Sequence, residues 1–252
     1  MGTAWLRPLL EALLGAVAAL LAVTERSARL DRPSRARRAA WSAVASPASR
    51  RCLLPDDGVD DETRAALAAA WNHEASVAHG ALVRSTQRAL ELASLGAPPS
   101  LVARAHEDAL DDIRRAKLCS AIARGMNGQS VPPAGSAARR PLLRARSGAL
   151  ASLAAGVVVD VALAHGRASR MHAKLARRTI DRTIRAALEE IAASEARHVA
   201  HAWAIVRWCI AEKAGGAVEH ALRGLVGRLP APRGFLPCEA LDGGWERWGI
   251  AG

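Results

Sequence analysis

Apolar residues recur at intervals of three and four positions along four long stretches of the chain, which is the spacing of one face of an α-helix. The pattern predicts helices over residues 60–95, 100–124, 148–176 and 181–214. Asp60 and Asp181 stand at the start of the first and fourth stretches, where an aspartate side chain caps the free N–H groups of a helix. The first helix would be roughly 50 Å long at 1.5 Å per residue.

The segments between these stretches indicate how the helices pack. A short loop, Gly96 to Pro99, joins the first two helices and favours an antiparallel hairpin. Residues 125–147 lack periodicity, and a connection of this length lets the chain cross to the far end of a bundle. We therefore predict an all-α fold, an antiparallel four-helix bundle with one long crossover between helices two and three. The bundle is expected over 59–214, between a lead-in (1–58) and a Gly/Pro-rich tail (215–252) that holds a short helix.

Each predicted helix carries one acidic residue within its apolar stripe. These residues are Glu74, Asp112, Asp160 and Glu195. The two hairpins also look like copies of each other, because the first and third helices read EASVAHG and DVALAHG from their acidic residues onward. Two such hairpins packed face to face would bury each other's apolar stripes and bring all four carboxylates into one buried cluster. Buried carboxylates need partners.

The sequence offers two kinds of partner for these carboxylates. His198 follows Glu195 by three residues, so the imidazole and the carboxylate share one face of the helix. The corresponding position after Asp112 is Arg115. A guanidinium group is always charged and only donates hydrogen bonds, so Arg115 cannot ligate a cation.

Four short runs together resemble the ferritin-like superfamily, and more closely a group of bacterial ferritin-like domain proteins. These runs are HEASVAH (73–79), LGAPP (95–99), DDIRRA (111–116) and SEARHV (194–199). The resemblance covers about Asp60 to Ala214. It implies that the helices form a bundle whose core holds two iron or manganese ions between carboxylates and histidines.

Carried over residue by residue, the resemblance implies a set of metal ligands. Glu74 and Asp160 would be the single-acid ligands, Asp112 and Glu195 the bridging acids, and His198 the one remaining imidazole. Two aspartates stand where glutamate is usual, and Arg115 replaces the second histidine. The other histidines, at positions 73, 79, 106 and 165, do not lie three or four positions from the nearest inward acid, so we expect them to face another helix or solvent.

Two functions follow from this pattern. With iron or manganese bound, the site would support oxygen-dependent oxidation of ferrous iron or of a small substrate. Without metal, Arg115 would supply the positive charge between the carboxylates, and the bundle would serve as a structural or binding module.

Composition limits the partners and the compartment. The formal net charge is +11, but aromatic residues make up only 3% of the chain, with seven Trp, one Phe and no Tyr, and this scarcity of stacking side chains argues against nucleic acid as a partner. Cys119 and Cys209 are expected to be buried within helices, whereas Cys52 and Cys238 could form a disulfide in an oxidising compartment. The apolar run from Ala12 to Val23 is short for a transmembrane helix. It fits either the core of a signal peptide or an N-terminal packing helix, so the sequence leaves cytoplasmic and exported locations open. The same apolar segment could also associate with a membrane.

Overall fold

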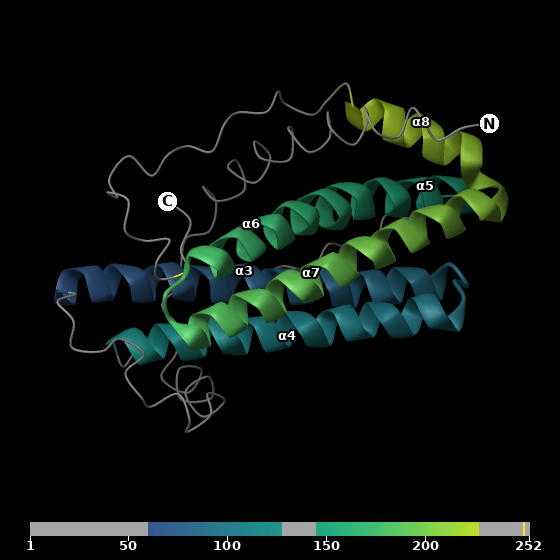
Figure 1. The fold of residues 1–252 in the computed structure, drawn as a ribbon. Coiled ribbons are helices and arrows are strands. Elements are labelled where there is room, and N and C mark those ends of the chain that lie inside the picture. The colour runs from purple at the N-terminus through teal and green to yellow at the C-terminus, as the bar shows by residue number, and fades with distance from the viewer. Residues whose placement is uncertain (1–59, 128–144, 227–248, 250–252) are drawn as a thin grey trace.

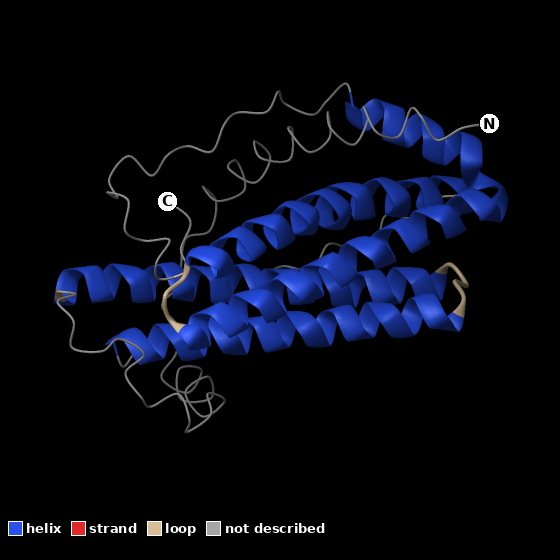
Figure 2. Cartoon of the chain, in the orientation of Figure 1, coloured by secondary structure: helices blue, strands red, loops and turns tan. Residues whose placement is uncertain are grey.

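A computed structural model describes residues 60–127, 145–226 and 249, and every regular element among them is helical (Figures 1 and 2). The all-α prediction is confirmed for this part of the chain. The apolar run from Ala12 to Val23, Cys52, Cys238 and residues 128–144 lie outside the described residues. The elements in chain order are α3 (Asp61–Ser94), α4 (Pro99–Asn127), α5 (Arg146–Val157), η4 (Val158–Leu163), α6 (Ala164–Arg178), α7 (Arg182–Cys209), η5 (Ile210–Ala214) and α8 (Gly215–Val226).

Helices α3 and α4 form the first hairpin and lie side by side in Figure 1. The predicted cap is present at the start of α3, where the Thr63 N–H donates to the Asp60 carboxylate at 2.7 Å. The turn between the helices needs Gly96, whose φ of 70° is a left-handed conformation that costs other residues energy. Helix α4 continues beyond its predicted end because Met126 is buried in the core.

The third predicted helix is one continuous helical segment, but it is not regular. Between α5 and α6 the chain forms a π-helical turn, η4, and this turn contains Asp160. A π turn adds a residue to the helical repeat and shifts the faces of all following residues. Hydrophobic periodicity alone did not reveal this turn.

Helix α7 begins at the predicted cap, because the N–H groups of Thr183 and Ile184 donate to Asp181 at 2.7 and 2.8 Å. It packs along α6 and continues through a second π-helical segment, η5, into α8. The predicted end of the fourth helix at Ala214 coincides with the end of η5, and α8 is the short helix expected in the tail.

The end of α4 and the start of α5 lie at opposite ends of the molecule, as the predicted crossover requires (Figure 1). Arg146 at the start of α5 donates to the Leu95 carbonyl, which lies in the turn between α3 and α4. Met126 instead packs in a cluster with Leu67 near the start of α3.

The core consists of two apolar clusters, and both include residues of all the long helices. One cluster contains Leu67, Ile122, Leu175 and Leu188, and the other contains Leu92, Leu150, Leu163 and Ile205. Cys119 and Cys209 are buried in these clusters as free thiols, as predicted. The buried polar residues occur at intermediate positions along the same helices, so a polar layer separates the two clusters.

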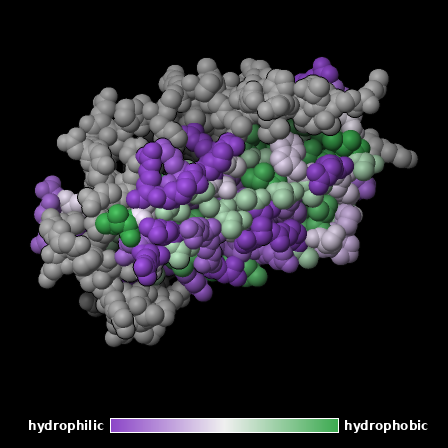
Figure 3. Space-filling view, viewed as in Figure 1, coloured by the Kyte–Doolittle hydropathy of each residue, from purple (hydrophilic) through white to green (hydrophobic). Residues whose placement is uncertain are grey.

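The outer surface is largely hydrophilic on the face that Figure 3 shows, with apolar patches near the end where α8 lies. Among the described residues, the continuous helix Arg146–Arg178 is long and apolar enough to cross a membrane. Half of its most apolar window, 50%, is buried inside the protein, and a core helix has the same composition.

Candidate metal centre

Arg115 of α4 lies at the centre of the polar layer and joins two of the predicted site residues. Its guanidinium binds Glu195 of α7 and lies 2.9 Å from the Glu74 carboxylate of α3. Its side chain is 7% exposed. Burial alone would lower the pKa of Arg115, but the charges of Glu195 and Glu74 raise it, so the side chain stays cationic.

A group of three metal-binding side chains lies on the other side of Glu195. His165 of α6 contacts the second oxygen of Glu195, and its Nδ1 lies 3.2 Å from Nδ1 of His198. The donor atoms of these three buried residues all lie within 4.8 Å of one another. Apart from this contact with His165, the Oε2 atom of Glu195 has no polar partner among the described residues. This group therefore presents two imidazole nitrogens and one carboxylate oxygen toward a common point.

His198 and Glu195 have the protonation states that suit metal binding. Burial, together with the neighbouring His165, lowers the pKa of His198 to about 4, so its imidazole is neutral at pH 7. Burial alone would raise the pKa of Glu195, but His165 and Arg115 lower it to about 2. A neutral imidazole and an ionised carboxylate are the forms that ligate metals.

Two more acids and one more histidine, Asp108, Asp111 and His201, lie near His198. Its Nε2 lies 3.6 Å from Asp108 and 3.7 Å from Asp111, both on α4. The other oxygen of Asp108 lies 2.6 Å from Nδ1 of His201, one turn along α7. The buried atoms His198 Nε2 and Asp108 Oδ1 have no hydrogen-bond partner among the described residues.

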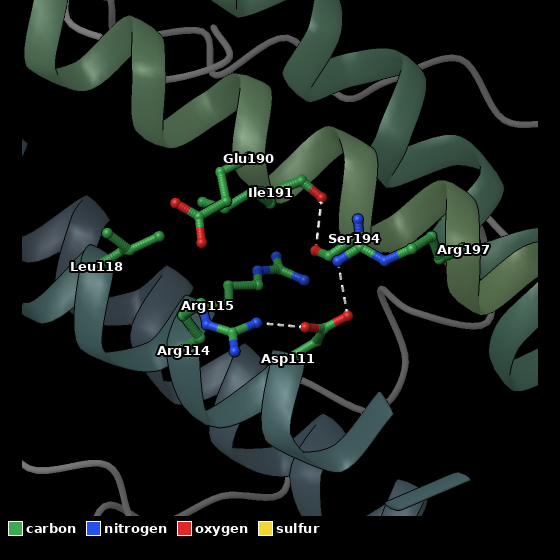
Figure 4. Close-up of a pocket in the computed structure, with 8 residues that line it drawn as sticks. All are labelled: Asp111, Arg114, Arg115, Leu118, Glu190, Ile191, Ser194 and Arg197. Carbon is green, nitrogen blue, oxygen red and sulfur yellow. Dashed lines mark hydrogen bonds and ion pairs between the residues drawn. The ribbon is translucent and has the colours of Figure 1, made fainter. Parts of the chain in front are cut away.

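Asp111 closes the outer side of this layer. Figure 4 shows its carboxylate between Arg114 and Arg197, at 2.5 and 2.8 Å, with Arg115 beside them. The cavity lined by these residues has a volume of about 10 Å³. A space of this size holds at most a single water molecule.

The remaining predicted ligands, Asp112 and Asp160, do not belong to the three-residue group. Asp112 is buried and accepts a hydrogen bond from Ser85 at 2.8 Å. Burial raises its pKa to about 6, and His165 and Ser85 oppose that shift in part. Asp160 is half-buried, and its charge acts with those of Asp108 and Asp112 on the buried Arg88. Glu74 and Glu195 thus both form ion pairs with Arg115, whereas Asp160 interacts electrostatically with Arg88.

His165 is the main residue that the sequence interpretation left out of the site. It does face another helix, as expected, but the surface it faces is the site itself. It follows Asp160 by five residues, which a regular α-helix turns to a different face. The intervening π turn closes i to i+5 hydrogen bonds, so the residues after it, His165 included, lie on a different face from the one that a regular α-helix would give them. The repeated Ala-His-Gly run had marked this position, but the helical spacing rule excluded it.

Comparisons with known proteins do not assign this arrangement to a family. No protein-family model matches the chain, and neither the curated proteins nor the solved structures gave a match.

Because the pKa of Asp112 is raised, we expect the free energy of unfolding of the metal-free protein to depend on pH. An aspartate ordinarily titrates at 3.8, and the folded protein retains this proton up to about pH 6. The unfolded chain releases it at a lower pH, near 3.8. The free energy of unfolding therefore falls as the pH rises from 3.8 to about 6, and the total loss above pH 6 is on the order of 3 kcal/mol.

Asp112→Asn keeps an oxygen that can accept from Ser85 but removes this charge. In urea unfolding of metal-free protein, the stability of Asp112→Asn relative to wild type should therefore increase as the pH rises from 4 to 6. A difference that stays constant from pH 4 to pH 8 would show that Asp112 is ionised at no cost.

Proposed function

We propose that this chain is a ferritin-like four-helix bundle that binds one iron or manganese ion through His165, Glu195 and His198. The observation that carries the proposal is the position of Arg115. Its guanidinium lies between Glu74 and Glu195, where the resemblance places metal, and the three-residue donor group lies beside it. One half of a two-metal site is thus replaced by a fixed organic cation, and the other half keeps a complete donor set.

The geometry of the donor group supports a single ion. Metal-to-imidazole distances are about 2.0–2.1 Å, so two imidazole nitrogens on one ion stand roughly 3 Å apart. The 3.2 Å between the Nδ1 atoms of His165 and His198 fits that spacing. The Oε2 atom of Glu195, which contacts His165, would supply the third donor.

Two histidines and one carboxylate form the donor set typical of non-haem ferrous sites that keep open coordination positions for oxygen. A bound ferrous ion would supply oxygen-dependent oxidation, either of iron itself or of a small substrate. The protein's contribution is to hold Glu195 ionised through Arg115 and to keep His198 neutral through burial.

A metal-free structural or binding module is the second candidate, and the same contact favours it. Arg115 already compensates two carboxylates without any metal. Thermal unfolding of metal-free protein in the presence of Mn²⁺ or Mg²⁺ separates the two candidates. An imidazole-containing site should be stabilised by Mn²⁺ and much less by Mg²⁺, because Mg²⁺ prefers oxygen ligands. A melting temperature indifferent to Mn²⁺ would favour the metal-free module.

Nε2 of His198 lies 3.6 Å from Asp108 in the metal-free arrangement, and we expect the two to form a hydrogen bond that orients His198 when metal binds at Nδ1. A ligating histidine usually donates its other ring N–H to a carboxylate, and the loss of that partner weakens metal binding by about 10–100-fold. We expect Asp108→Asn to weaken Mn²⁺ binding to this extent, as measured by the free Mn²⁺ signal in electron paramagnetic resonance. Glu107→Gln is the matched control, because Glu107 is an exposed neighbour on α4 that pairs with Arg104. Equal affinity in Asp108→Asn and wild type would mean that Asp108 plays no part in the site.

A further inference from the structure

We infer that a second site, separate from the metal centre, binds a small monocarboxylate with a short apolar chain. It is a cavity of about 330 Å³, open to solvent, between the beginning of α4 and the second half of α7. This volume is within the range of pockets that hold small molecules. The inference goes beyond the proposed function and does not require that metal be bound.

Small side chains create the apolar part of this cavity. Ala200 and Ala204 lie one turn apart on α7, and Leu101 lies across from them in the first turn of α4. Methyl groups at these two positions of α7 leave space that larger side chains would fill. A short hydrocarbon chain placed there would remove apolar surface from water on both sides.

Positive charge gathers at the same cavity from two helices. Arg104 of α4 and Arg197 of α7 both line it, with side chains 32% and 46% exposed. Arg104 bonds Glu107 through Nη1 and Arg197 bonds Asp111 through Nη2. A guanidinium has five N–H donors, so each can bind a ligand carboxylate in addition. The N-terminus of α4, with its partial positive charge, lies at Leu101 and adds to the attraction.

His201 is the observation that points to a ligand. Its side chain lines the cavity and its residue is 5% exposed, yet Nε2 has no hydrogen-bond partner among the described residues. Its other nitrogen is engaged with Asp108. An unsatisfied buried polar atom costs about 1–3 kcal/mol, and a bound ligand can relieve that cost.

Titration of the metal-free full-length protein with hexanoate, followed by amide chemical shifts in nuclear magnetic resonance, tests this site. Hexan-1-ol is the neutral probe of the same chain length. We expect saturable binding of hexanoate with shifts centred on Leu101, Ala200, His201 and Ala204, and binding of the alcohol at least about tenfold weaker, because it lacks the charge-assisted hydrogen bonds.

Two variants locate the binding. Ala204→Leu fills the cavity and should abolish hexanoate binding, whereas Ala193→Leu, at an exposed position of α7 outside the cavity, should leave it unchanged. Arg197→Gln should weaken binding by about tenfold. This variant keeps the apolar lining, so it tests the site even if Ala204→Leu does not fold.

The inference is wrong if hexanoate binding does not saturate, if hexan-1-ol binds equally well, or if a folded Ala204→Leu variant binds hexanoate like wild type. Mn²⁺ is absent from this experiment, so its failure leaves the metal proposal untouched.

Discussion

Replacing Arg115 with alanine should lower the free energy of unfolding of the metal-free protein by about 3–5 kcal/mol. The loss is large because Arg115 is buried between Glu74 and Glu195, and removing one member of a buried ionic group leaves the others uncompensated. Urea unfolding followed by circular dichroism measures the change.

The neighbouring arginine provides a matched control for that result. Arg114 also pairs with a carboxylate, Asp111, but its side chain is 56% exposed. Exposed ion pairs contribute about 0–1 kcal/mol, so Arg114→Ala should be nearly as stable as wild type. If Arg115→Ala unfolds at the same urea concentration as Arg114→Ala, the guanidinium does not compensate the acid layer.

The Arg115→His variant tests whether position 115 can gain a metal ligand. A neutral imidazole three residues after Asp112 restores the acid and histidine pair that the resemblance implies for the first hairpin. This variant should bind more iron or manganese than wild type and should be stabilised by that metal. Thermal unfolding indifferent to added ferrous or manganous ion would contradict this role of position 115.

His165 and His198 should be equally necessary for metal binding, although they lie on different helices. Their Nδ1 atoms face each other beside Glu195, so His165→Ala and His198→Ala should each weaken Mn²⁺ binding by more than the roughly 10–100-fold expected for an outer residue. Equilibrium binding of Mn²⁺ to each purified variant measures the loss.

His172→Ala is the control for general damage to the core. His172 is another buried histidine of α6, 3% exposed, but it does not belong to the three-residue donor group. Its removal should leave Mn²⁺ affinity within a few-fold of wild type. If only His198→Ala loses the metal, His165 is not a ligand. The ligand set predicted from the sequence, which contains His198 but not His165, would then be correct at this position.

The local features of the fold followed from the sequence because each depends on a few neighbouring residues. Asp60 and Asp181 cap the helices they were predicted to cap, and Gly96 turns the chain between α3 and α4. The inward direction of Asp112 and Glu195 was also predictable, because helical spacing placed them on apolar stripes and both are buried.

The composition of the site was less predictable because it depends on contacts between helices and on one irregular turn. The π turn Val158–Leu163 precedes His165 and shifts the face on which it lies, and hydrophobic periodicity did not indicate that turn. Asp108 and His201 were detectable in principle, since they lie four residues before Asp112 and three after His198 on the same helical faces. Their pairing across α4 and α7 required the packing of the two hairpins.

The number of metal ions per chain tests the central proposal most directly. Protein purified from cells supplied with iron and manganese should contain, by plasma mass spectrometry, close to one iron or manganese ion per chain, and His198→Ala protein should contain almost none. Two ions per chain would contradict the role of Arg115 as a replacement cation. Metal-free protein under the same conditions, or equal metal in wild type and His198→Ala, would show that His165, Glu195 and His198 do not form the metal site.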